Sequence, residues 1–256
     1  MTDRDDRGRQ LHLSVVLPVH NEAPNLAVLW DELSAVIDAQ DWSAEVIFVD
    51  DGSTDDSAAV IRKLRHSDPR IRLVRLAANA GLSAAFDAGL KRVSGRYVVT
   101  MDADLQNDPC DIPRLLACLE RWDVATGCRQ PRRDPGLRRI SSRIANAIRN
   151  AMTGENIRDS ACSLRAMKRE CVKDLNLDYS GFHRFVPTLL RMAGYRLVEV
   201  PVNHRPRRFG VSHFGIRNRA WKAFGDLLFV RWMLRNRIDY QIEEGDDPHG
   251  GGDENG

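Results

Sequence analysis

Short apolar runs alternate with segments of helical periodicity over the first 104 residues, and this order is the strongest constraint on the fold. The runs read LSVVLPV, EVIFVDD, IRLVRL and RYVVTMDAD, and the segments between them lie near 25–39, 55–66 and 81–93. Strands that are apolar on both faces occur in parallel sheets that helices cover on both sides. The order therefore predicts an α/β fold with a mainly parallel central sheet flanked by helices.

The pattern changes from about residue 123. A short strand (DVATG), an arginine-rich amphipathic helix near 137–152, the segment SLRAMKREC, a helix near 182–193 and a strand (RLVEVPVNH) are predicted there. We expect these elements to form a lid over the first half of the chain and to bind a second substrate, the acceptor. The ends of the chain, residues 1–10 and 241–256, are polar and are expected to be disordered, which leaves one folded domain over 11–240.

The composition places the chain among folded proteins that dissolve in water. It is 43% hydrophobic and 29% charged, and it contains no run of about 18 uncharged apolar residues, the length that a membrane-spanning helix needs. No apolar segment follows the charged N-terminus, so we expect neither export nor a membrane span. The five cysteines are an odd number without metal-type spacing, and they are expected to be reduced thiols in the cytoplasm.

Acidic residues follow the fourth apolar run. Asp102 and Asp104 come directly after it, and Gln106 lies two residues further on. Ligands of parallel sheets bind at the carboxyl ends of the strands, and oxygen ligands suit Mg²⁺ or Mn²⁺. A pair of turn-forming, helix-capping aspartates is the structural alternative. Either reading places these side chains at an edge of the sheet.

A second acidic pair, Asp50 and Asp51, ends the second run in the motif VDDGSTD. Helix capping explains the residues that follow the pair, Ser53, Thr54 and Asp55. It does not explain two adjacent carboxylates, whose repulsion is disfavoured unless a ligand, a metal or a hydrogen-bond donor offsets it. A base or a ribose hydroxyl is a reasonable partner for this pair.

Four motifs in the first half resemble the nucleotide-sugar half of family 2 glycosyltransferases, which have the GT-A (nucleotide-diphospho-sugar transferase) fold. They are VVLPVHNEAPN, VIFVDDGSTDDS, NAGLSAAFDAGL and YVVTMDADLQNDP. Further along, HRFVPTLLRMAGYRLVEVPVNHRPRRFGVSHFG resembles the polyprenyl-phosphate branch of that family, which includes dolichol-phosphate mannose synthase. The resemblance divides a single GT-A catalytic domain into a nucleotide-sugar half (about 11–122), an acceptor half (about 123–218) and an amphipathic helix (about 219–240).

The resemblance also implies the site residues. It places Asp102, Asp104 and Gln106 on a Mg²⁺ or Mn²⁺ ion that bridges the donor diphosphate, and Arg207 with Ser212 on the same diphosphate. Arg129 and Arg143 match the arginines that bind the lipid phosphate. Asp159 matches a family position that is either catalytic or structural. The remaining donor-binding positions are Pro18, Asn21, Glu22, Asp50 or Asp51, Asp102 and Ala103.

The reaction implied by the resemblance is an inverting transfer of a sugar from UDP-sugar or GDP-sugar to a polyprenyl phosphate at the cytoplasmic face of a membrane. A phosphate acceptor is already anionic and needs no general base. A hydroxyl of a glycan or lipid is the alternative acceptor, and it would need a base such as Asp159. A non-catalytic basic module is the third possibility, but a nucleic-acid binder gains nothing from a carboxylate cluster, so we expect no nucleic-acid partner.

Two basic segments of the sequence are each compatible with more than one role. The segment 219–240 contains Trp221 and Trp232 among apolar and basic residues, and it is expected at a membrane surface, although a core helix or a contact in a homo-oligomer would have the same composition. The arginine-rich stretch before residue 150 is expected to form a solvated helix face outside the two acceptor positions. Its other arginines are Arg132, Arg133, Arg138 and Arg149.

Overall fold

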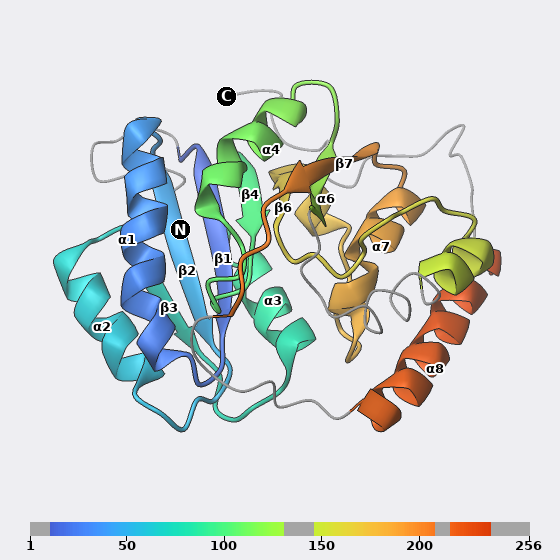
Figure 1. Ribbon diagram of the computed structural model, residues 1–256, viewed down its shortest axis with the longest axis horizontal. Coiled ribbons are helices and arrows are strands. Elements are labelled where there is room, and N and C mark those ends of the chain that lie inside the picture. The colour runs from blue at the N-terminus through green and yellow to red at the C-terminus, as the bar shows by residue number, and fades with distance from the viewer. Residues whose placement is uncertain (1–10, 131–145, 208–215, 237–256) are drawn as a thin grey trace, which may run out of the picture.

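The computed structural model describes residues 11–130, 146–207 and 216–236, the side chains of 216–224 excepted. One seven-stranded sheet in the order β3-β2-β1-β4-β6-β5-β7 forms the centre of the molecule (Figure 1). The expected α/β class with a mainly parallel central sheet is confirmed. The strands are β1 (Leu13–Val19), β2 (Ala44–Asp50), β3 (Ile71–Arg75), β4 (Tyr97–Thr100), β5 (Val124–Arg129), β6 (Arg165–Lys168) and β7 (Leu197–Val202).

Helices connect these strands as the periodicity predicts. The helices expected near 25–39, 55–66, 81–93 and 182–193 are all present, and the arginine-rich helix is described over residues 146–153. The labelled helices are α1 (Ala23–Ala39), α2 (Ser57–Ser67), α3 (Leu82–Leu90), η1 (Pro109–Asp111), α4 (Ile112–Cys118), α6 (Arg169–Lys173), η2 (Phe182–Phe185), α7 (Val186–Met192) and α8 (Ile216–Arg235).

Each face of the sheet has its own core. Leu13, Val15 and Leu17 of β1 pack with α1, α2 and α4 on one face. Val16, from the same strand, packs with α3, α7 and α8 on the other face. Successive side chains of a strand point to opposite faces, so a strand covered on both sides must be apolar at every position. This is why the strands read as unbroken apolar runs in the sequence.

The second half of the chain extends the sheet. β6 runs antiparallel to both β4 and β5, and β7 runs parallel to β5, so β5 and β7 point the same way as β1, β2 and β4. The carboxyl ends of these five strands therefore share one edge. The second half of the chain thus contributes three strands to the central sheet, and the carboxyl ends of β5 and β7 face the same edge as those of the first half.

Candidate functional site

Asp104 and Arg207 meet at the shared sheet edge. Nη2 of Arg207 donates to Oδ2 of Asp104 at 2.6 Å, although 103 residues separate them in the chain. Asp104 is 6% exposed. The structure therefore brings together two residues that the resemblance assigned to the donor diphosphate.

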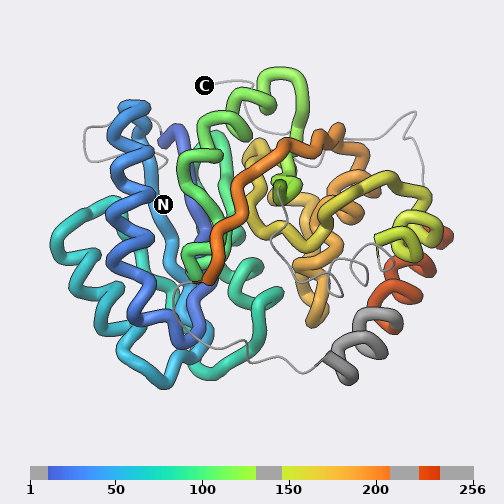
Figure 2. The backbone as a smooth tube through the Cα atoms, viewed as in Figure 1, coloured from blue at the N-terminus to red at the C-terminus, as the bar shows by residue number. Residues whose placement is uncertain are grey.

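Backbone pairing explains how the segment after β7 reaches Asp104. After Val202 the chain runs on toward the segment that follows β4 (Figure 2). There His204 forms a bridge with Asn107, and the backbone N–H of Arg205 donates to the carbonyl oxygen of Gln106 at 2.9 Å. Two residues beyond that bond, Arg207 lies beside Asp104.

The turn after β4 carries backbone strain. Leu105 has a φ of 63°, in the left-handed region that bulky residues rarely adopt, and its side chain is buried. The backbone N–H of Gln106 then donates to Oδ1 of Asp104 at 3.1 Å. Strain of this kind persists only where the surrounding structure imposes it, and it gathers at functional sites.

Three carboxylates crowd this end of β4. Burial, and after it the charge of Asp104, raise the pKa of Asp102 to about 6. Burial also raises the pKa of Glu22, and the charges of Asp104 and Asp102 add to that effect. Because each carboxylate disfavours ionisation of its neighbours, a cation placed among them would be stabilised.

These residues fit a divalent cation that arrives together with a diphosphate. Among the described residues, no group of three His, Cys, Asp or Glu side chains is arranged to hold a metal by itself. Mg²⁺ is commonly held by one or two carboxylates and the phosphates of the substrate. Asp102 and Asp104 would supply the two carboxylates, and this role remains a prediction. The amide nitrogen of Gln106 lies 3.4 Å from the carbonyl oxygen of Arg205, so its role as a third ligand remains a prediction.

Hydrogen-bond donors explain the acidic pair at the end of β2. Both oxygens of Asp51 accept backbone N–H groups, from Ala80 at 2.7 Å and from Gly81 at 2.9 Å. Oδ1 of the fully buried Asp50 accepts the N–H of Ser53, and its Oδ2 lies 3.0 Å from Nε of Arg75. The repulsion noted in the sequence is thus offset by backbone hydrogen-bond donors and by the positive charge of Arg75. Contacts of this pair with a nucleotide remain a prediction.

The loop after β1 is fastened to the loop after β2. Oδ1 of Asn21 accepts the N–H groups of Thr54 and Asp55 at 2.8 and 3.3 Å, and the backbone N–H of Asn21 donates to Ser53 Oγ. Pro18 is buried inside β1, and Ala103 is buried after β4. Donor binding by these three residues, Asn21, Pro18 and Ala103, remains a prediction.

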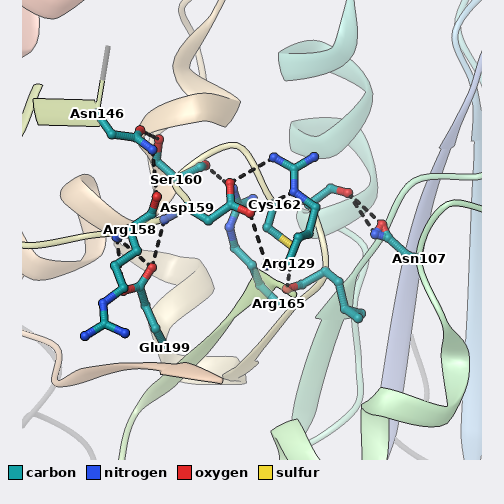
Figure 3. A network of polar contacts seen from close by, with 11 residues as sticks. Asn107, Arg129, Asn146, Arg158, Asp159, Ser160, Cys162, Arg165 and Glu199 are labelled. Carbon is teal, nitrogen blue, oxygen red and sulfur yellow. Dashed lines mark hydrogen bonds and ion pairs between the residues drawn. The ribbon is translucent and has the colours of Figure 1, made fainter. Parts of the chain in front are cut away.

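The half-buried Arg129, at the end of β5, pairs with the buried Asp159 (Figure 3). Nε and Nη2 of Arg129 donate to the two carboxylate oxygens at 2.7 and 2.8 Å, and the backbone N–H of Arg129 donates to Oδ2 at 3.2 Å. Asp159 is 1% exposed. The carboxylate therefore fixes the plane of the guanidinium at the sheet edge.

Two further arginines are buried nearby, and sequence reasoning missed both. The expectation that Arg149 lies on a solvated helix face is wrong, because it is 5% exposed and its Nη2 donates to the carbonyl oxygen of Ile157. Arg165 of β6 is 3% exposed and donates to the carbonyl oxygen of Ser160. A buried position on a strand or on a helix is not visible in an arginine-rich sequence pattern. Other predicted positions lie outside the described residues: Arg132, Arg133, Arg138, Arg143 and Ser212.

Helix α8 combines a buried and an exposed apolar face in its described half. Leu227 and Val230 are buried in the core, whereas Leu228, Phe229 and Trp232 are 47%, 39% and 59% exposed. The rings of Phe229 and Trp232 stack at 6.1 Å. No helix among the described residues combines the length and apolar content that crossing a bilayer requires. The exposed face is thus an apolar surface patch on a helix that is anchored to the core.

Comparison with known proteins gives a family match and named relatives. The model of the family described as "Glycosyl transferase family 2" matches residues 14–175. A dodecaprenyl-phosphate galacturonate synthase of Rhizobium johnstonii is 36% identical over 90% of this chain and 70% of its own length. An undecaprenyl-phosphate 4-deoxy-4-formamido-L-arabinose transferase of Edwardsiella ictaluri is 36% identical over 80% of this chain. This chain spans 63% of that transferase.

Solved structures share the fold. Glucosyl-3-phosphoglycerate synthase from Mycobacterium tuberculosis, in complex with Mn²⁺, UDP and phosphoglyceric acid, aligns with a TM-score of 0.66 at 20% identity over 90% of this chain and 80% of its own. A mannosyltransferase from Pyrobaculum calidifontis, in complex with GDP-Man and Mn²⁺, aligns with a TM-score of 0.60 at 22% identity, over 90% of this chain and 66% of its own. The GT-A fold expected from the sequence is confirmed.

Proposed function

This chain belongs to glycosyl transferase family 2, and from that premise we propose that it transfers a sugar from a nucleoside-diphosphate sugar to a polyprenyl phosphate. Two relatives at 36% identity are named for transfer to dodecaprenyl or undecaprenyl phosphate, which supports this acceptor. The donor is a UDP-sugar or a GDP-sugar, in keeping with the nucleotides in the structural neighbours. Both substrates would meet at the shared sheet edge.

One observation carries the proposal. Asp104, from the first half of the chain, contacts Arg207, from the second half, beside the carboxylates of Asp102 and Glu22. A mixed cluster of this kind offers both carboxylates for a cation and a guanidinium for phosphate oxygens. A diphosphate with its cation needs both kinds of group at one place.

The residues have separate tasks in the proposed reaction. Asp102 and Asp104 would hold Mg²⁺ or Mn²⁺, which when bound supplies positive charge to the donor diphosphate. Arg207 would bind the same diphosphate and stabilise the negative charge that grows on it as the sugar leaves. An oxygen of the acceptor phosphate attacks C1 of the sugar from the opposite side, so one displacement inverts the anomeric configuration.

The acceptor side favours a phosphate over a hydroxyl. A hydroxyl acceptor would need a carboxylate base, and Asp159 is the residue that the sequence offers. Both oxygens of Asp159 already accept hydrogen bonds from Arg129, so this carboxylate is poorly placed to take a proton. Arg129 would instead contribute positive charge for an acceptor that is already anionic.

The exposed patch on α8 suits a substrate that lies in a bilayer. We assign Leu228, Phe229 and Trp232 to the membrane surface, where aromatic and apolar side chains of an interfacial helix are buried among the lipid headgroups. In this arrangement the protein would act at the cytoplasmic face as a peripheral enzyme. Association of two copies through the same patch is the competing outcome.

A donor and acceptor panel tests the function. Purified protein is incubated with UDP-sugars and GDP-sugars, with and without a short-chain polyprenyl phosphate, and the release of nucleoside diphosphate is measured. We expect release that depends on the polyprenyl phosphate and on Mg²⁺ or Mn²⁺, and that stops in a chelator. Release that requires a glycan or a lipid hydroxyl in place of the phosphate would establish the alternative acceptor class.

A further inference from the structure

Glu199 of β7 holds the loop that carries Asp159. Its Oε1 accepts the backbone N–H groups of Arg158 and Asp159, each at 2.9 Å, and its Oε2 accepts that of Arg158 at 3.0 Å (Figure 3). Glu199 pairs with Thr126 of β5, so its position is set by the sheet. A carboxylate that accepts two successive backbone N–H groups fixes the peptide between them.

The opposite side of the same loop is held by different groups. Side chains of the helix over residues 146–153 donate to carbonyl oxygens: Asn150 to Ile157 at 3.0 Å, and Asn146 to Arg158 at 2.6 Å. Oδ1 of Asn150 also accepts the N–H of Ile157 at 3.3 Å, whereas Glu199 accepts the N–H groups of Arg158 and Asp159. Losing Glu199 would free the peptide nearest Asp159 and leave the helix contacts in place.

The loop in turn determines where Arg129 points. Asp159 holds the guanidinium through two hydrogen bonds and the backbone of Arg129 through a third. Arg129 is the last residue of β5, at the edge where the substrates are proposed to meet. Contacts thus run without interruption from Glu199 to the loop, to Asp159 and to Arg129 (Figure 3).

We propose that Glu199 is a positioning residue, which aims Arg129 at the acceptor phosphate by fixing the Asp159 loop. The inference rests on the proposed function, because it takes the acceptor to be a phosphate. Glu199 itself touches no substrate in this scheme. Its loss should weaken use of the acceptor and leave use of the nucleotide sugar unchanged, because the donor groups lie on other segments of the chain.

The test compares the steady-state kinetics of Glu199→Gln with those of the parent protein. Glutamine keeps the shape of the side chain but replaces one acceptor oxygen with an amide that cannot accept a backbone N–H. We expect the KM for polyprenyl phosphate to rise about tenfold, the equivalent of one lost charge-assisted hydrogen bond, with the KM for the nucleotide sugar unchanged. Glu120→Gln, the same change at an exposed position, is the matched control and should alter neither constant.

A double-mutant cycle separates positioning from a general loss of structure. If Glu199 acts through Arg129, then Glu199→Gln should add nothing to the acceptor KM of Arg129→Ala. Additive effects, or equal changes in the KM of both substrates, overturn the inference. If Glu199→Gln does not fold, Asp159→Asn breaks the same relay one step later, and an unchanged acceptor KM in that variant overturns the inference as well.

The kinetics of the parent protein separate a failure of the role of Glu199 from a failure of the proposed function. A parent that uses polyprenyl phosphate, with a Glu199→Gln variant that behaves identically, refutes the role of Glu199 and leaves the proposed function standing. A parent that uses no polyprenyl phosphate with any donor refutes the proposed function, and the role of Glu199 is refuted with it.

Discussion

Replacing Asp102 with asparagine is expected to stabilise the metal-free protein at neutral pH. Burial and the charge of Asp104 raise the pKa of Asp102 from 3.8 to about 6, even with the attraction of Arg165 and Arg129 included. Because the folded pKa lies above the unfolded pKa, the folded state binds the proton more tightly. Stability is therefore lost as the pH rises from about 4 to about 6.

The size of the effect follows from the shift. A rise of about two pKa units corresponds to about 3 kcal/mol of lost stability at pH 7.5, and to about 1 kcal/mol at pH 4.5, where most of the folded protein still carries the proton. Asp102→Asn removes this cost, and asparagine retains an oxygen for its hydrogen bond with Ser163. The substitution should thus raise the free energy of unfolding by about 2 kcal/mol more at pH 7.5 than at pH 4.5.

Urea unfolding of the parent and the variant in a chelator, at both pH values, measures this difference. Asp31→Asn, at an exposed aspartate, is the control and should show no pH-dependent gain. Mn²⁺ with a nucleoside diphosphate should then stabilise the parent by about 2.7 kcal/mol at a hundredfold excess over the parent's dissociation constant, and the variant by less. Two results would refute the reasoning. One is an equal increase in the free energy of unfolding at pH 4.5 and pH 7.5, and the other is equal stabilisation of the parent and the variant by the cation.

Three further outcomes are expected. Gly52 has a φ of 63°, and a Cβ there would lie 2.5 Å from a backbone nitrogen. Gly52→Ala should therefore lower the free energy of unfolding by more than about 2 kcal/mol. A loss below about 1 kcal/mol in urea unfolding would contradict this. Burial alone would raise the pKa of Asp123, but hydrogen bonds from a lysine and an arginine lower it to about 2. The stability that Asp123 contributes is therefore present above about pH 4 and is lost toward pH 2. In thermal melts, Asp123→Asn should lower the melting temperature much more at pH 7 than at pH 2. An equal lowering at the two pH values would contradict this. Replacing Leu228 and Trp232 with serine should release the protein from sedimented anionic vesicles. Each apolar side chain that is buried in the membrane surface contributes about 1.5 to 3 kcal/mol to the free energy of binding. A variant that sediments with the vesicles as well as the parent would place the membrane contact elsewhere.

Most of the sheet and its helices could be predicted from the sequence, because their signals are local. An apolar run such as LSVVLPV must lie between two covered faces, and the helical spacing after it repeats within one or two turns. The position of the acidic residues follows from the same pattern. Asp50 and Asp102 come at the ends of strands, and parallel strands bring their ends to one edge.

The partners of those side chains could not be predicted in this way. The pattern does not show that the two oxygens of Asp51 accept the N–H groups that precede α3, whereas contact of Asp50 or Asp51 with a nucleotide remains a prediction. Arg149 was expected on a solvated helix face, and it is buried with its Nη2 donating to the carbonyl oxygen of Ile157. An aspartate or an arginine has the same appearance in a sequence whether its partner is water, a backbone group or a substrate.

The sequence by itself determined the class of fold, the order of its elements and the edge at which charged residues gather. Only the tertiary structure decided which charges meet: Arg207 with Asp104 across 103 residues, and Arg129 with Asp159 across 30. The physical reason is that helix and strand periodicity depends on neighbours within a few residues, whereas these contacts depend on the register between distant backbone segments. The pairing of Gln106 with Arg205 sets the first contact, and the hold of Glu199 on the Asp159 loop sets the second.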